Sequence, residues 1–452
     1  MNRQPLIHAG ILAAPEISFE LSGIYTLTRT RDEIAEASRP FTGFCRAILR
    51  GEEVKLILSG ASSVCSSQLT LTPASPGCSF LVRQVSIGIA FHWEQQEDLR
   101  YSGSLRLLPE DGLVRLINLI RLETYLESVI SSEMRATSSP ELLKAHAVIS
   151  RSWLLAQLER RKKPGAAAPG HTETETPGER IRWYDREDHR LFDVCADDHC
   201  QRYQGTGRIL SKQAIEAVQS TYGEVLISAG AICDARFSKC CGGMTENFER
   251  VWEPVPHSYL TGIRDAETGT VKPDLSREKQ ARKWIRSNPP AFCNTQYKPV
   301  LTQVLPQFDR RTTDFYRWKV SYSQEELANL LLRKTGTDFG TILRLDPVER
   351  GVSGRLVRLR VTGSKQTLVI GKELEIRKAL SPSHLYSSAF VVDYPEIRNG
   401  IPRQFLLHGA GWGHGVGLCQ IGAAVMAEHG FSYRHILAHY FRGAELKTIY
   451  KP

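Results

Sequence analysis

The chain has 452 residues, of which 41% are hydrophobic and 24% are charged, and its formal net charge is +9 at pH 7. This composition is ordinary for a folded globular protein of about two to four domains or subdomains. The positive charge favours anionic partners, but it does not choose between nucleic acid, anionic lipid and cell-wall polymer. No uninterrupted apolar run approaches the ~20 residues of a membrane-spanning helix, so no transmembrane segment is predicted.

The N-terminal sequence MNRQPLIHAGILAAPEISFE contains a short apolar stretch that Pro5, Pro15 and Glu16 interrupt. It lacks the continuous apolar region of a signal peptide. Two possibilities therefore stay open: the protein acts inside the cell, or its export signal is not part of this chain. The ten cysteines are scattered apart from two clusters, which argues against a disulfide-rich scaffold.

The first quarter of the chain is predicted to consist mostly of strands. Between residues 6 and 115, runs such as EVKLILSG alternate apolar and polar residues, and Gly, Pro and Ser separate them. A helical pattern begins near Leu122, in LETYLESVISSEM. A second helix is predicted for residues 140–161, with Ser139 as its N-cap and Pro140 in the first position.

The rest of the chain mixes both kinds of element. Residues 162–180 are rich in Pro, Gly, Thr and Glu, which predicts a flexible surface loop, and residues 265–315 show little pattern. Further helices are predicted at residues 211–221, 323–336, 423–430 and 432–443. Further strands are predicted at residues 224–230, 232–238, 341–349, 355–363 and 366–371. Because strands and helices do not alternate as βαβ units, we expect an α+β fold.

The most unusual local feature is the segment HGAGWGHGVGLCQ, residues 408–420, in which every second position from Gly409 to Gly417 is glycine. Glycine at this density lets the backbone approach a ligand closely or adopt positive φ angles. The spacing matches neither a dinucleotide-binding fingerprint nor a P-loop. Two interpretations stay open: a tight turn crowded by backbone, or a loop that presents His414 and Gln420 at a site.

Four motif-bearing segments follow one another between about residue 115 and residue 447. They are LETYLESVISSEMRATSSPELLKAHAVISRSW, ARFSKCCGGMTENFERVWEPVPHSYL, GKELEIRKALSPSHLYSSAF and GWGHGVGLCQIGAAVMAEHGFSYRHILAHYFRGAEL. In this order they resemble the motifs of the stage II sporulation protein D/amidase enhancer (SpoIID/LytB) family. The resemblance implies a catalytic region over residues 115–452, containing a cleft, after a strand-rich N-terminal region of residues 1–114.

The resemblance also implies an activity, the cleavage of peptide-stripped peptidoglycan glycan strands by a lytic transglycosylase. An acid protonates the glycosidic oxygen, and the sugar's own C6 hydroxyl closes on C1 to give a 1,6-anhydro end. Because this nucleophile is internal, the second carboxylate of ordinary glycoside hydrolases is not needed. Glu133 occupies the family's acidic position and is expected to serve as acid and then as base. Without its motif, it would be an ordinary exposed or capping glutamate.

Several residues near these motifs are candidates for substrate binding. Lys144 and Arg151 lie close to two helical turns apart, so they share a face, although solvated helix charges are the alternative. His146 stands where the family usually has Gln, a departure that puts substrate contact there in doubt. Ser238 and Lys239, which precede a Gly-Gly pair, are candidate sugar contacts.

The segment HRLFDVCADDHC offers two histidines and two cysteines, namely His189, Cys195, His199 and Cys200. Such a set can complete a tetrahedral zinc site, although its spacing is looser than CxxC. Some family members carry a similar arrangement, so the resemblance favours zinc. Four protein ligands leave no open position, so we expect a structural Zn²⁺. A metal-free pair of thiols, or a Cys195–Cys200 disulfide in an exported protein, is the alternative.

Three other functions compete with glycan cleavage. Some relatives enhance cell-wall amidases, which would make the chain a non-catalytic glycan-binding protein with an amidase partner; the presence of Glu133 together with Lys144 favours the enzyme. Zinc hydrolysis would need an open, three-ligand site. No pattern of a nucleic-acid-binding module is present, so we expect no nucleic-acid partner. The resemblance implies peptidoglycan glycan strands as partner and the cell envelope or periplasm as location.

These predictions converge on one arrangement. We expect the cleft to lie between the Glu133 helix pair and the segment of residues 408–420, with Glu133 and His414 in one concave site.

Overall fold

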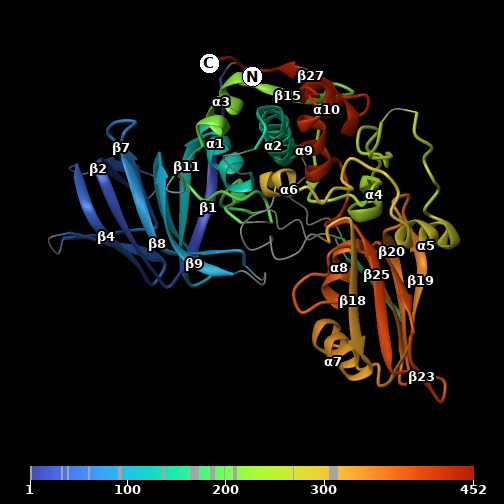
Figure 1. Cartoon of the computed structure of the whole chain (residues 1–452). Helices are drawn as coiled ribbons and strands as arrows, with labels where there is room; N and C mark the ends of the chain where they lie inside the picture. The colour runs from blue at the N-terminus through green and yellow to red at the C-terminus, as the bar shows by residue number, and fades with distance from the viewer. Residues whose placement is uncertain are drawn as a thin grey trace. The chain divides into compact units, whose positions relative to one another are not determined.

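The computed structural model describes residues 3–31, 34–37, 40–59, 62–89, 94–134, 138–162, 173–183, 189–197, 199–206, 211–267, 269–304 and 314–452. The chain forms two compact units, each built from separate stretches of sequence. Unit 1 comprises residues 1–136, 189–224 and 448–452, and unit 2 comprises residues 137–188 and 225–447. Both strands and helices are abundant, and Figure 1 colours them in order from the N-terminus to the C-terminus. The predicted α+β class is therefore confirmed.

Unit 1 is built on a 12-stranded sheet whose main path runs β14-β1-β11-β10-β7-β2-β4-β5-β6, with β3, β8 and β9 attached to it. Its first strands are β1 (Leu6–Ala14), β2 (Glu16–Arg31), β3 (Ile34–Ala37), β4 (Phe41–Arg50), β5 (Glu53–Leu58) and β6 (Ser63–Ser66). The others are β7 (Gln68–Pro73), β8 (Ser79–Ile87), β9 (Gln95–Ser102), β10 (Ser104–Glu110), β11 (Leu113–Arg121) and β14 (Val194–Cys195).

The sheet of unit 1 follows from alternating side chains. In β8, Phe80 and Val82 are fully buried, while Leu81 between them is partly exposed. This period of two buries one face of each strand. The predicted strand-rich N-terminal part is therefore confirmed.

Two helices complete unit 1. They are α1 (Leu122–Glu133) and α3 (Lys212–Ser220), which pack against each other. The apolar residues of α1 recur at helical spacing and are fully buried, including Leu122, Leu126 and Ile130. The hydroxyl of Ser211 caps α3 by accepting a hydrogen bond from the Ala214 N–H.

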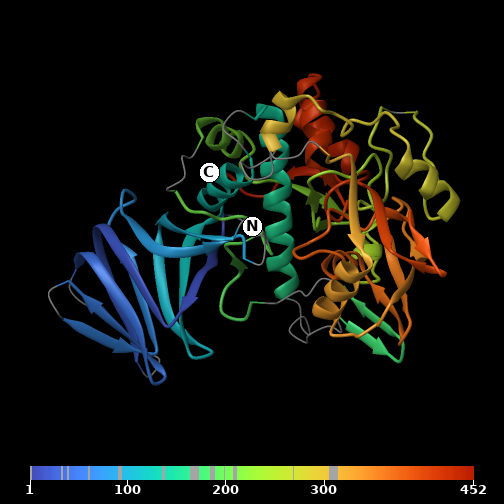
Figure 2. The same cartoon turned by 60° about the horizontal axis from the view of Figure 1, so that its bottom comes forward.

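Unit 2 combines helices with several small sheets. Its helices are α2 (Pro140–Arg161), α4 (Phe248–Val251), α5 (Glu278–Arg286), α6 (Lys298–Val304), α7 (Gln324–Thr335), α8 (Glu373–Ala379), α9 (Gln420–Glu428) and α10 (Tyr433–Tyr440). The long helix α2 packs against α9 and α10, and Figure 2 displays it along its length. Within the described residues, no helix has both the length and the apolar character needed to cross a membrane.

The larger sheets of unit 2 have the orders β12-β13-β21-β20-β19 and β18-β25-β22. Their strands are β12 (Glu173–Thr176), β13 (Glu179–Arg182), β18 (Arg317–Ser323), β19 (Ile342–Arg350), β20 (Leu356–Gly363), β21 (Thr367–Gly371), β22 (Phe390–Asp393) and β25 (Gln404–Ala410). The shorter strands are β15 (Glu224–Ser228), β16 (Ala231–Ile232), β17 (Phe237–Ser238), β23 (Ile397–Arg398), β24 (Ile401–Pro402), β26 (Leu418–Cys419) and β27 (Glu445–Thr448).

Several predicted elements are confirmed, including the residues at which they begin and end. Helix α2 spans residues 140–161 with Ser139 at the N-cap position, although its hydroxyl makes no capping hydrogen bond. Helix α7 has a full capping box between Ser323 and Glu326, and Gly336 ends it at a φ of 69°.

Other predictions need correction. Within the predicted loop of residues 162–180, β12 and β13 form a hairpin, and residues 163–172 lie outside the described part. The strand predicted for residues 232–238 is reduced to short pairings at its two ends. Residues 265–315 contain α5 and α6, whose short helical patterns the sequence inspection missed.

Candidate functional site

Glu133 is the last residue of α1, and its side chain is half-buried. The buried apolar face of α1 fixes the direction in which the helix delivers this carboxylate. One carboxylate oxygen, Oε1, accepts a hydrogen bond of 3.3 Å from the backbone N–H of Arg202. Glu133 is therefore tied to the segment that follows the predicted zinc ligands in sequence.

That segment, residues 189–206, is anchored to the sheet of unit 1. Strand β14 pairs in parallel with β1, which sets Cys195 beside Gly10. A Cβ at Gly10 would lie 2.7 Å from the ring of Phe192, so glycine is needed for this close approach. The Asp197 carboxylate accepts hydrogen bonds of 2.9 Å from the backbone N–H groups of Gly88 and Ile89. These contacts anchor the segment to the sheet of unit 1 and to the loop after β8.

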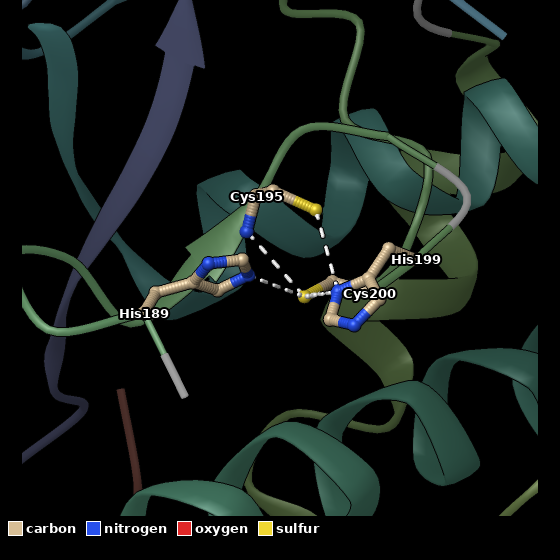
Figure 3. A group of neighbouring side chains, drawn as sticks. All are labelled: His189, Cys195, His199 and Cys200. Carbon is tan, nitrogen blue, oxygen red and sulfur yellow. Dashed lines mark hydrogen bonds between the residues drawn. The ribbon is translucent and has the colours of Figure 1, made fainter. Parts of the chain in front are cut away.

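The four predicted zinc ligands come together in this segment. We call His189, Cys195, His199 and Cys200 the His189 cluster; their ligand atoms all lie within 4.8 Å of one another. Figure 3 shows the four side chains directed toward a common point, with Cys200 Sγ 3.5 Å from both His189 Nε2 and His199 Nδ1. Two sulfur and two nitrogen donors, partly buried, are the donor set and number of a structural zinc site.

The surroundings of the His189 cluster favour the thiolate form of Cys195. Hydrogen bonds from Cys200 first, then from His189 and His199, hold the pKa of the Cys195 thiol well below its usual value, against the effect of burial. The ring of His189 stacks on Phe192, with ring centroids 4.4 Å apart. Thiolate and neutral imidazole are the forms that bind a metal ion.

A buried polar layer lies beneath this segment. The Tyr203 hydroxyl donates a 2.6 Å hydrogen bond to Asn118 Oδ1, and the Asn118 amide donates to the backbone carbonyl groups of Ser102 and Ser104 at 2.9 Å. The Tyr203 ring lies 4.7 Å from that of Tyr125, and burial raises the pKa values of both phenols well above normal. A satisfied buried amide of this kind fixes the position of the residues attached to it.

The candidate residues on α2 differ in exposure. Lys144 is partly exposed, pairs with Glu141 at 2.7 Å and lies over the ring of Tyr433. Arg151 and His146 are fully buried. Lys144 is therefore the one of the three that reaches the surface of unit 2.

His146 and Gln420 are brought together from distant parts of the sequence. The two Nε2 atoms are 3.1 Å apart, and His146 Nδ1 lies 3.3 Å from the hydroxyl of Ser150. Burial, followed by the charge of Lys239, lowers the pKa of His146 to about 3. A neutral His146 thus connects α2 to the first residue of α9. A substrate contact by either residue stays a prediction.

The glycine-rich segment of residues 408–420 is crowded by backbone. A Cβ at Gly417 would lie 2.1 Å from the carbonyl oxygen of Arg236, and one at Gly411 would lie 2.7 Å from that of Cys240. Both glycines have positive φ angles, 72° and 77°. A tight turn accounts for these positions, and it also delivers His414 and Gln420.

His414 is held from both sides of its ring. Its Nδ1 accepts a 3.0 Å hydrogen bond from the Val416 N–H, and the ring also bonds to the backbone of Phe237. Burial, followed by the guanidinium groups of Arg236 and Arg355, lowers the pKa of His414 well below normal. The imidazole is therefore neutral at ordinary pH and helps to shape its own loop.

The two candidates before the Gly-Gly pair have different environments. Ser238 is buried, and its hydroxyl has no hydrogen-bond partner among the described residues. Lys239 is half-buried, and its ammonium group donates a 2.8 Å hydrogen bond to the carbonyl of Val304. Their strand, β17, pairs in parallel with β26, which sets Ser238 beside Cys419.

Sequence inspection missed Arg355, which organises the glycine-rich segment. This arginine is buried, and its guanidinium group donates to the carbonyl groups of Gly413 and Cys241 at 3.0 to 3.2 Å. Glu246 plays a similar part, because its buried carboxylate accepts hydrogen bonds from Ser353 and from neighbouring backbone N–H groups. Arg355 stands in no pattern that distinguishes it from a surface charge, whereas Glu246 falls within the second motif-bearing segment, directly after the Gly-Gly pair and Met244-Thr245.

The candidate residues divide between the two units. Glu133 and the His189 cluster belong to unit 1, whereas the candidates on α2, β17 and residues 408–420 belong to unit 2. The cleft expected between Glu133 and His414 stays a prediction.

Two family models match the chain. Residues 110–227 match the family described as stage II sporulation protein, and residues 246–417 match a domain of unknown function (DUF8618). An uncharacterized protein of Brachyspira hyodysenteriae is 25% identical over 351 residues, which cover 77% of this chain and 72% of that protein.

Two further relatives carry informative names. Stage II sporulation protein D of Bacillus amyloliquefaciens is 23% identical over 328 residues, covering 72% of this chain and 74% of that protein. The amidase enhancer of Bacillus subtilis is 24% identical over 351 residues, covering 72% of this chain but 40% of that protein. These matches place the chain in a class, the proteins that contain a stage II sporulation protein domain. The predicted resemblance to the stage II sporulation protein D/amidase enhancer (SpoIID/LytB) family is confirmed, because residues 110–227 match its family model and three similar proteins carry its names.

Proposed function

We propose that this chain is a lytic transglycosylase that cleaves peptidoglycan glycan strands, with Glu133 as its general acid and base. The observation that carries the proposal is the setting of Glu133. Its half-buried carboxylate is the end point of a well-packed helix and is held by the backbone of the segment that bears the His189 cluster. The family resemblance supplies the class of substrate.

The proposed reaction needs one carboxylic acid and no water. Protonated Glu133 gives its proton to the glycosidic oxygen as the bond between that oxygen and C1 breaks. The C6 hydroxyl of the same sugar forms the new bond to C1 and passes its proton to the Glu133 carboxylate. Glu133 ends in its starting form, and the products are a 1,6-anhydro end and a free hydroxyl.

The hydrogen bond from Arg202 assigns different tasks to the two carboxylate oxygens. Since its N–H donates to Oε1, we assign proton transfer to Oε2. A carboxylate fixed in one orientation loses less entropy on reaching the reactive geometry.

Unit 2 carries the remaining candidates for glycan binding. Lys144, Lys239 and His414 have partly exposed side chains and are our candidates for direct binding. The buried side chains of His146, Arg151, Ser238 and Gln420 would act by positioning α2, β17 and α9.

We further propose that the His189 cluster holds a structural Zn²⁺. The donor set fits, because two thiolates and two imidazoles lie within 4.8 Å of one another on a segment anchored by Asp197. The ion would fix the segment whose Arg202 N–H holds Glu133, and it leaves the acid–base chemistry to that carboxylate.

The catalytic proposal is tested with peptide-free glycan strands and mass spectrometry of the products. We expect wild type to produce 1,6-anhydro-muramic ends and Glu133→Gln to do so at least about 100-fold more slowly, because a general acid contributes that much. Glu127→Gln is the matched control, because this glutamate lies on the same helix and is also partly buried. Equal rates for Glu133→Gln and wild type would remove Glu133 from the mechanism.

The zinc proposal is tested by elemental analysis of the purified protein. We expect Cys195→Ser to lose one zinc ion per chain relative to wild type, and Cys65→Ser, a partly exposed cysteine elsewhere in unit 1, to lose none. An unchanged zinc content in Cys195→Ser would contradict the assignment.

A second candidate function is enhancement of a cell-wall amidase without catalysis. The observation in its favour is the match to the amidase enhancer of Bacillus subtilis, which covers 72% of this chain. Under this alternative, the protein would leave glycan strands intact and raise the rate at which an added amidase releases stem peptides.

A further inference from the structure

A second group of metal-ligating side chains lies in the interior of unit 2. Three cysteines and an aspartate, which we call the Cys241 cluster, place their ligand atoms within 4.8 Å of one another: Cys241, Asp265, Cys293 and Cys419. Each is at most 2% exposed. The distance from Cys241 Sγ to Cys293 Sγ is 3.5 Å, and that from Cys241 Sγ to Asp265 Oδ2 is 3.3 Å.

These four residues come from four separate segments that other contacts hold together. Cys241 follows a residue whose backbone pairs with Trp412, and Cys419 lies in β26, beside β17. The backbone N–H of Asp265 donates to the carbonyl of Gly243 at 3.1 Å, and the N–H of Phe292 donates to the carbonyl of Asp265 at 2.8 Å. The donor positions are therefore preorganised by the fold.

A second layer of hydrogen bonds points at the ligand atoms. The Cys241 N–H donates to Cys419 Sγ at 3.2 Å, and the Cys293 N–H donates to Asp265 Oδ2 at 3.2 Å. The Tyr440 hydroxyl donates to Asp265 Oδ1 at 2.7 Å. Such donors orient the ligands of protein metal sites and stabilise their negative charge.

A glycine in a helix makes room for this arrangement. A Cβ at Gly422, inside α9, would lie 2.3 Å from the Tyr440 hydroxyl and 2.8 Å from Asp265 Oδ2. Glycine inside a helix is less stable than alanine because it loses more conformational freedom on folding. Its presence here allows α9 to pack directly on the carboxylate.

We propose that the Cys241 cluster is a second Zn²⁺ site, with three thiolates and one carboxylate as its ligands. Zinc binds four such ligands in a tetrahedron, and a Zn–S distance of about 2.3 Å gives sulfur atoms roughly 3.8 Å apart. Soft thiolates favour zinc over magnesium or calcium. A bound cation also offsets the cost of burying the charge of the Asp265 carboxylate.

The ion would join the segments that form the candidate substrate-binding side of unit 2. Cys241 precedes the Gly-Gly pair, and Cys419 immediately precedes Gln420. A closed, four-ligand site of this kind is structural, so it would fix the start of α9 and the end of the glycine-rich segment. The inference does not depend on the proposed glycan cleavage, because its test measures bound metal.

The test uses the double variant Cys195→Ser/Cys200→Ser, which removes the His189 cluster and leaves the Cys241 cluster intact. Purified from zinc-supplemented cells and analysed by native mass spectrometry, it should retain one zinc ion per chain. A chain without bound zinc would overturn the proposal. The double variant does not disturb the interior of unit 2. It therefore remains decisive even where variants of the Cys241 cluster fail to fold.

Further variants on the same background locate the ion. Adding Cys293→Ser should remove the remaining zinc, whereas adding Cys233→Ser should not; Cys233 is a buried free cysteine of unit 2 outside the cluster. Retention of zinc in the Cys293→Ser variant would contradict the ligand set. Loss of zinc in the Cys233→Ser variant would show that any buried substitution suffices, which also contradicts it.

A thiol count separates the metal site from a disulfide. Wild type denatured without reductant, in the presence of a chelator, should react with a thiol reagent at all ten cysteines. A count lower by two, with a Cys241–Cys293 peptide pair in the digest, would replace the metal site by a disulfide. Cobalt in place of zinc should also give the charge-transfer absorption of thiolate ligands in the double variant, and its absence would count against the site.

Discussion

His146 and Gln420 show how a residue's role depends on contacts that are remote in sequence. One lies in α2 and the other at the start of α9, yet their side chains meet inside unit 2. The sequence made both candidates for substrate contact, with His146 in doubt because the family usually has Gln there. The structure gives them an additional task, the connection of two helices, which no local pattern reveals.

A buried neutral histidine makes stability depend on pH. The pKa of His146 is about 3 in the folded chain, below its usual value of 6.5, so the unfolded chain binds a proton between these values that the folded chain does not. Stability should therefore fall as the pH falls from 6.5 toward 3, by about 1.4 kcal/mol per pH unit. In His146→Gln, the loss of melting temperature between pH 7 and pH 5 should be smaller than in wild type. Replacing the exposed His429 by Gln is the control and should leave the wild-type pH dependence; equal slopes for all three proteins would refute the assignment.

The two cysteine clusters differ in how well the sequence alone could predict them. The His189 cluster falls within a segment of twelve residues, so its donor types made it a candidate zinc site, which the family resemblance favoured. The Cys241 cluster draws its ligands from positions as far apart as 241 and 419. Only the folded chain brings those side chains together, because they lie in four separate segments.

At the scale of elements, capping residues predicted the ends of α7 most reliably. The Ser323 capping box and Gly336 define both ends of α7, because each satisfies backbone groups that the helix leaves open. The hairpin of β12 and β13 was predicted as a loop, although Pro177-Gly178 marks its turn. Its strands are polar, and β13 is held by parallel pairing with β21, almost 200 residues away in the chain. Long-range pairing of this kind leaves no local apolar pattern.

The glycine-rich segment allows a test of backbone crowding. In Gly417→Ala, the new Cβ would meet the Arg236 carbonyl at 2.1 Å, in addition to the strain of a φ of 72°. Gly400→Ala is the matched control, because that glycine has a φ of 74° but no atom within 4 Å of the Cβ position. We expect about 1–2 kcal/mol of destabilisation from the angle alone in the control. Gly417→Ala should lose roughly 1–3 kcal/mol more in chemical unfolding; equal losses would mean that the segment is not crowded there.

At the scale of the whole molecule, the α+β class and the strand-rich start were predictable because they rest on many short alternating runs. The order in which the chain passes between the two units was not predictable in this way. Residues 189–224 return to unit 1 after α2 and the β12–β13 hairpin, because β14 pairs with β1 and the Asp197 carboxylate bonds to Gly88. This return brings the His189 cluster and the backbone of Arg202 to Glu133.

The central claim, that one carboxylate drives an internal ring closure, is tested most directly by digesting peptide-free glycan strands in water enriched in oxygen-18. No amidase or other enzyme is added, and the new ends are analysed by mass spectrometry. An intramolecular nucleophile predicts 1,6-anhydro ends that contain no oxygen-18 and weigh one water less than hydrolysed ends. Reducing ends that carry oxygen-18, or strands left uncut by wild type, would contradict the account.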